Sequence, residues 1–223
     1  KSAQCQDLFE FLKKHEVTIW GFDSQFSSVY SFRNFSVMLF NFLNENKIAY
    51  EPIFKTQVEK AMQRGPEINR VLKDKEIVQL FTTIDTLLKN SDVQKSHFWA
   101  QALQSFKSSV QQNVSKRKLG IEVRDKQMAS NLNFLTSEQK DRKFLVWAAN
   151  AHISKLDLPA MNEQTMGFQY LRLNPDITYH IAFSSIRMPY RKEKWITEQR
   201  KDPNNLLSLL PSLSKNYYLD CNA

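Results

Sequence analysis

An apolar run that ends in two polar side chains limits the folds open to this chain more than any other feature. Residues 144–147 read Phe-Leu-Val-Trp, and Asn150 and His152 follow closely. A short continuous apolar run is typical of a strand whose two faces are both covered by helices. We therefore predict a buried strand with Asn150 and His152 beyond its carboxyl end, where open α/β sheets bind their ligands.

His152 is the candidate catalytic residue of this strand end. An imidazole takes or gives a proton near neutral pH, so it can serve as a general acid or base. The alternative is a histidine that only caps a loop. The local pattern supports both interpretations equally.

A second strand is predicted at residues 17–20, which read Val-Thr-Ile-Trp and include β-branched side chains. It leads into Gly21, which permits close backbone approach, and then into Asp23 and Gln25. If the two strands are parallel neighbours, these polar groups share a crevice with His152. Asp23 would then orient the imidazole or bind a substrate hydroxyl. In the alternative interpretation, Asp23 is the N-cap of the next helix.

A long helical region is predicted between the two strands. Apolar residues recur at helical spacing in two stripes, which we interpret as core. We leave Phe26, Tyr30 and Phe32 as candidate wall residues of an apolar cleft. The stripes are Ile77, Leu80, Phe81, Ile84, Leu87 and Leu88, followed by Trp99, Leu103, Phe106, Val110 and Val114.

An arginine shares an apolar stripe in a later helix. Arg124, Met128, Asn131 and Leu135 are spaced i, i+4, i+7 and i+11. Burying an arginine without a partner is costly. In one interpretation Arg124 points into the cleft and pairs with a carboxylate, a substrate oxygen or an oxyanion. In the other, its stem packs while its head reaches solvent.

Composition and missing motifs narrow the functional classes. The 223 residues are 42% hydrophobic and 12% aromatic, enough to bury a substantial core. The net charge of +8 would attract anions, but the basic residues form short clusters diluted by acids, so we predict no nucleic-acid partner. No run is long enough to span a bilayer. Cys5 and Cys221 fit no metal or redox spacing, and we predict neither a metal nor another cofactor.

Three familiar catalytic motifs do not occur in the sequence: the phosphate-binding Gly-x-x-x-x-Gly-Lys loop, His-Glu-x-x-His and Gly-x-Ser-x-Gly. Phosphate-loop, zinc-protease and ordinary serine-esterase chemistry therefore lack their residues.

Four short motifs do occur in a fixed order. They read Gly-Phe-Asp-Ser-Gln at 21–25, Arg-Asp-Lys-Gln-Met-Ala-Ser-Asn at 124–131, Trp-Ala-Ala-Asn-Ala-His at 147–152, and Thr-Met-Gly at 165–167. In this order they resemble the erythromycin esterase family, which includes proteins labelled as succinoglycan biosynthesis factors. The resemblance covers about residues 6–185. It implies an α/β fold, with a mostly parallel sheet and a large helical insertion, and hydrolysis of an ester or lactone by histidine-activated water.

On this basis, residues 1–30 and 119–185 are predicted to form two parts of an α/β core. Residues 31–118 are the helical insertion, and 186–223 are a C-terminal segment. The resemblance makes His152 catalytic. Asp23, Gln25, Arg124 and Asn150 would bind or orient a small-molecule ester or lactone.

Two departures from the family qualify this prediction. Relatives carry an earlier His-Gly-x-x-Glu-like motif that supplies the proposed base, and none precedes Lys1. We therefore expect this chain to be the later part of a longer protein, holding part of an active site and inactive alone. Many relatives also have histidine where this sequence has Ala149. The alternative is a non-catalytic binding or biosynthesis-associated member that keeps the cleft but has lost part of the histidine set.

Overall fold

A computed structural model of the chain describes residues 6–26, 28–64, 71–154, 164–175 and 201. The chain divides into two units, residues 1–179 and 180–223. Every described residue except Lys201 belongs to the first unit, and Lys201 is exposed. The predicted C-terminal segment, 186–223, therefore lies outside the described residues apart from Lys201.

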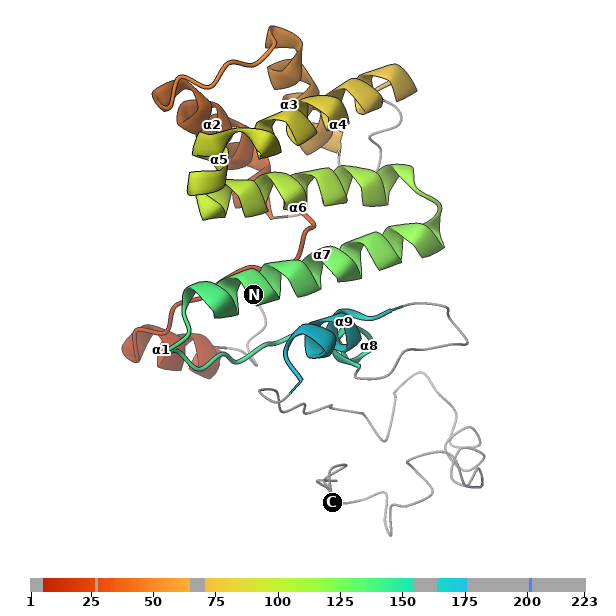
Figure 1. The fold of residues 1–223 in the computed structure, drawn as a ribbon. Coiled ribbons are helices and arrows are strands. Elements are labelled where there is room, and N and C mark those ends of the chain that lie inside the picture. Colours follow the sequence, from red (N-terminus) through yellow and green to blue (C-terminus); the bar gives the residue numbers. More distant parts are fainter. Residues whose placement is uncertain (1–5, 27, 65–70, 155–163, 176–200, 202–223) are drawn as a thin grey trace. The chain divides into compact units, whose positions relative to one another are not determined.

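The described part of the first unit is built from helices, labelled along the chain in Figure 1. They are α1 (Gln6–Lys14), α2 (Val29–Glu45), α3 (Pro52–Arg64), α4 (Asp74–Lys89), α5 (Ser91–Lys95), α6 (His97–Val114), α7 (Arg117–Glu138), α8 (Asn150–Ile153) and α9 (Met166–Leu173). Within these residues no helix combines the length and apolar character that a membrane crossing requires.

The predicted parallel sheet is wrong for the described residues, which contain helices but no strand. Residues 17–20 and 144–147, where we predicted strands, adopt no regular secondary structure. Side chains in the second segment do alternate: Phe144 and Val146 are half-buried, whereas Leu145 is 92% and Trp147 73% exposed. This is the periodicity of a strand with one covered face. A strand also needs a hydrogen-bonded neighbour, and the described residues provide none.

The larger hydrophobic core is shared by α2, α3, α4, α5 and α6. Both predicted stripes contribute to it: Ile84 of α4 and Leu103 of α6 have no exposed surface. Asn90 caps α5 in the turn between α4 and α6, because its side chain accepts hydrogen bonds from the backbone of Asp92 and Val93. Other residues of this core without exposed surface are Leu39, Leu43, Phe54, Val58, Leu80 and Val93.

The long helix α7 belongs to two layers. It packs against α6 on one side and against α9 on another. A second, smaller core lies on the α9 side and consists of Met128, Ala129, Leu132, Met166 and Tyr170. Phe22, Val146, Ala148 and Ile153 pack against it. The segments predicted as strands therefore meet at α7, which brings their polar ends to one helix.

Candidate active site

His152 contacts a buried carboxylate that we did not predict. It lies in the short helix α8, and its Nδ1 atom is 2.7 Å from Oδ1 of Asp125 in α7. Oδ1 receives no hydrogen bond with acceptable angles from the described residues. At 2.7 Å the two atoms are in direct contact. The side chain of His152 is 20% exposed and that of Asp125 is 5% exposed.

The second oxygen of Asp125 is held by a helix terminus. Oδ2 accepts a hydrogen bond from the backbone N–H of Met166, at 3.0 Å, where α9 begins. The first N–H groups of a helix have no partner within the helix, and its N-terminal end favours negative charge. Asp125 is therefore fixed between α9 and His152.

The Thr-Met-Gly motif fastens α9 to the end of α8. The Thr165 hydroxyl accepts a hydrogen bond from Phe168 N–H at 3.2 Å and donates one to the Ser154 carbonyl at 2.7 Å. Gly167 lies so close to α8 that an added Cβ would be 2.5 Å from the Ile153 carbonyl oxygen. The motif therefore sets the position of α8, which carries His152.

Arg124 and Asp23 form a bidentate pair. Nε of Arg124 donates to Oδ1 of Asp23 at 3.0 Å, and Nη2 donates to Oδ2 at 2.6 Å. The hydrogen bond with Asp23 raises the pKa of Arg124 above its usual value, although burial opposes the increase; the charges of Asp23 and Asp125 also raise it. Of the partners predicted for Arg124, the carboxylate is the one found.

Asp23 therefore binds the arginine, and Asp125 contacts the imidazole. The alternative role of Asp23 as a helix N-cap is wrong, because Ser28 caps α2 through its hydroxyl. Asp23 also accepts a hydrogen bond from the backbone N–H of Gln25 at 3.0 Å, and Gln25 itself is half-buried. Asn150 is the first residue of α8, and its side chain lies outside the described part.

Arg124→Leu should lower the free energy of unfolding by roughly 1–3 kcal/mol, the range for hydrogen bonds to charged groups. The loss should be smaller than for a fully buried pair, because 39% of the Asp23 side chain is exposed and water can solvate it. Urea denaturation measures the effect. Lys126→Leu is the control, since it removes the same charge from an exposed position of α7. Equal stabilities of the two variants would contradict the pair's contribution.

Asn131 anchors the Asp23 segment to the helices. Its amide donates to the Phe22 carbonyl at 2.9 Å. Its Oδ1 atom accepts from Gln101 at 2.6 Å, from Ser105 at 2.9 Å and from Gln127 at 2.9 Å. The predicted position of Asn131 on the covered stripe of α7 is confirmed, since it is 7% exposed.

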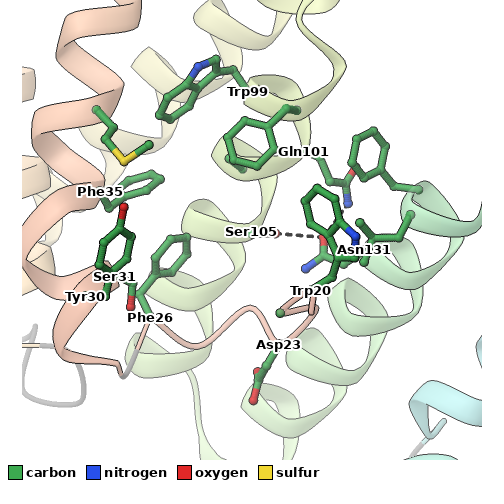
Figure 2. A pocket seen from close by; sticks show the side chains of 16 residues that line it. Trp20, Asp23, Phe26, Tyr30, Ser31, Phe35, Trp99, Gln101, Ser105 and Asn131 are labelled. Atoms are coloured by element: carbon green, nitrogen blue, oxygen red, sulfur yellow. Dashed lines mark hydrogen bonds between the residues drawn. The ribbon is translucent and has the colours of Figure 1, made fainter. Parts of the chain in front are cut away.

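A pocket of about 270 Å³ lies between the segment that contains Asp23 and the helices α2, α6 and α7. Seven of its sixteen lining residues are aromatic, and Figure 2 shows Tyr30 and Phe35 beside Phe26, with Trp99 and Trp20 farther along the lining. Two of the three candidate wall residues, Phe26 and Tyr30, line it, whereas Phe32 does not. Asp23 is at its edge.

The structure thus brings the predicted residues to neighbouring positions on α7. Asp23 joins the pocket to Arg124, and the next residue along the helix, Asp125, joins α7 to His152. We did not predict Asp125 because we considered only the stripe of this helix that contains Arg124. Asp125 belongs to a second helical stripe with Ala129 and Leu132, which are spaced i+4 and i+7 from it, and all three residues are buried. An acidic residue in an otherwise apolar stripe was the signal in the sequence that could have identified it.

Within the described residues, no three His, Cys, Asp or Glu side chains gather closely enough to hold a metal ion. A set of helices that holds a histidine against a buried carboxylate is compatible with a hydrolase-like protein. The model of the erythromycin esterase family matches residues 1–196, and the chain belongs to this family. No curated protein and no solved structure matches the chain significantly.

Proposed function

We propose that this chain carries part of the active site of a hydrolase that cleaves an ester or lactone. The observation that supports the proposal best is the 2.7 Å contact between His152 Nδ1 and the buried Asp125. A carboxylate at Nδ1 favours the tautomer whose Nε2 atom accepts a proton. It also stabilises the imidazolium that forms when the proton has arrived.

The proposed step is addition of water to the carbonyl carbon. The water oxygen forms the new C–O bond, its proton passes to a base, and the carbonyl oxygen becomes an oxyanion. Collapse of this intermediate breaks the bond to the alcohol, which leaves with a proton. His152 would transfer one of these protons or hydrogen-bond to the oxyanion. Arg124 would offer its Nη1 atom as a hydrogen-bond donor, since its Nε and Nη2 atoms are bonded to Asp23 while Nη1 has no partner among the described residues.

Ala149 supports a second candidate, a binding protein without hydrolytic activity. The family resemblance implies a histidine at this position in many relatives, and alanine cannot move a proton. Ala149 is exposed and is the N-cap of α8, one turn before His152. The two candidates therefore differ in whether a restored imidazole at position 149 yields turnover.

We expect the 223-residue chain to hydrolyse p-nitrophenyl butyrate no faster than buffer, and Ala149→His to raise the rate by about tenfold or more. General acid–base catalysis typically contributes about 10²- to 10⁴-fold, and an introduced group will fall at or below the lower end. Residues three apart on a helix are neighbours, so the new imidazole can act with His152. The measurement is the initial rate of each protein solution divided by the rate in buffer alone.

Ala151→His is the matched control, because Ala151 is also exposed and belongs to the same helix. The gain should disappear when His152→Gln or Asp125→Asn is added to Ala149→His. If Ala149→His is no faster than Ala151→His, the hydrolase proposal fails and the binding candidate replaces it.

A further inference from the structure

The aromatic pocket leaves large apolar side chains at its rim open to solvent. Trp20 is 45% exposed, Tyr30 70% and Phe98 52%, and all three line the pocket. Grouped exposed apolar side chains are uncommon on soluble proteins and mark surfaces that bind something. Phe35, at 8% exposed, forms part of the covered interior of the same pocket.

The charge around the pocket selects against ions. Asp23 is the only charged residue among the described residues that line it. Both of its carboxylate oxygens are bonded to Arg124, so its charge is already compensated. Figure 2 shows its side chain pointing away from the aromatic rings. A charged ligand would lose its hydration without gaining a counterion, which is costly.

The serine hydroxyl and amide side chains of the lining are held by hydrogen bonds to other groups of the protein. Gln101 donates from Nε2 to Ser130 and to Asn131, and Ser105 donates to Asn131, as the dashed line in Figure 2 indicates. The Ser31 hydroxyl is bonded to Ser28. The pocket therefore offers aromatic surface in preference to free hydrogen-bonding groups.

Its size suits a small ring system. A cavity of about 150 Å³ is enough for benzene, so a cavity of about 270 Å³ can hold one or two fused rings. It is smaller than the clefts of roughly 300–1,000 Å³ that enclose whole drug-sized ligands. The ring of Phe35 is tilted by 59° to Phe26 and by 51° to Trp99, so the wall offers both faces and edges for stacking.

We propose that this pocket binds an uncharged one- or two-ring group of the ester or lactone substrate, and that the rest of the substrate lies outside it. This inference rests on the proposed function, because it takes the bound group to be part of the substrate of the hydrolase. The pocket selects by neutrality and size. Asp23 connects it to Arg124, which precedes the carboxylate in contact with His152.

Three naphthalene compounds test the proposal: methyl 1-naphthoate, which is neutral, the 1-naphthoate anion and the 1-naphthylmethylammonium cation. Binding to the 223-residue chain is followed by quenching of tryptophan fluorescence, since Trp20 and Trp99 line the pocket. We expect the neutral ester to bind at least about tenfold more tightly than either ion, a difference of about 1.4 kcal/mol. Equal affinity for an ion would overturn the proposal.

Two variants locate the binding. Ala102→Phe fills the pocket from α6 and should weaken binding of the neutral ester about tenfold or more, whereas Gln104→Phe, at an exposed position of the same helix, should not. Tyr30→Ala removes part of the rim without disturbing the core and should weaken binding several-fold. Its control is Val37→Ala, exposed on α2 and outside the pocket.

Binding that survives both Ala102→Phe and Tyr30→Ala would place the ligand elsewhere and overturn the inference. If Ala102→Phe does not fold, Tyr30→Ala decides alone. The hydrolase proposal is judged separately by the Ala149→His rates. If the neutral ester binds but Ala149→His gives no gain in turnover, the hydrolase proposal is overturned and the pocket is the site of a binding protein. If turnover increases but the neutral ester does not bind, only the assignment of the pocket is overturned.

Discussion

Asn131→Leu should lower the free energy of unfolding by roughly 3–5 kcal/mol, because several buried polar groups lose their partner together, each at a cost of about 1–3 kcal/mol. Leucine can neither accept the hydrogen bonds from Gln101, Ser105 and Gln127 nor donate to the Phe22 carbonyl. The loss is less than the sum of four such costs, since Gln101 and Gln127 are half-buried and can turn toward water.

Urea or guanidinium denaturation of parent and variant measures this difference. Asn133→Leu is the matched control on the same helix, because Asn133 is half-buried and accepts one side-chain hydrogen bond, from Asn174 at 3.0 Å. Its loss should be about 1 kcal/mol. Similar losses for the two variants would mean that Asn131 is not the anchor of the Asp23 segment. The Asn131 variant should also lose affinity for the neutral naphthoate ester, because Phe22 lies between Gly21 and Asp23, which line the pocket.

Gly167→Ala is expected to lower the free energy of unfolding by about 2 kcal/mol. The added Cβ would lie 2.5 Å from the Ile153 carbonyl oxygen and 2.8 Å from that of Ser154, both backbone atoms that cannot turn aside. Overpacking of this kind typically costs about 1–3 kcal/mol. The better helix propensity of alanine offsets up to about 1 kcal/mol, which we expect to be recovered only in part.

The shift should also move α8, and with it His152, away from Asp125. Gly167→Ala combined with Ala149→His should therefore lose most of the expected rate gain in the molecules that remain folded. Gly21→Ala is the control, since nothing lies within 4 Å of a Cβ added there. A thermal midpoint for Gly167→Ala equal to that of Gly21→Ala would contradict the close approach of α8 and α9.

Helices were predictable because their signal is local. The spacing of Ile77, Leu80 and Ile84 places them on one face of α4 whatever the rest of the chain does, and all three are buried. Strands could not be predicted with the same security. We predicted that both faces of the run at residues 144–147 are covered. In the described structure one face is covered, and neither edge of the run is hydrogen-bonded to a second strand. Strand formation depends on a neighbour that may be remote in sequence.

The sequence alone determined the family, through the order of four motifs, and the need of Arg124 for an acceptor. It also identified His152 as the candidate catalytic histidine. The tertiary structure decided the partners. Arg124 pairs with Asp23, which is 101 residues away in the sequence, and the carboxylate in contact with His152 is that of Asp125. A helical stripe follows from spacing within one segment, whereas an ion pair forms only between side chains that packing of α7 against distant segments brings together.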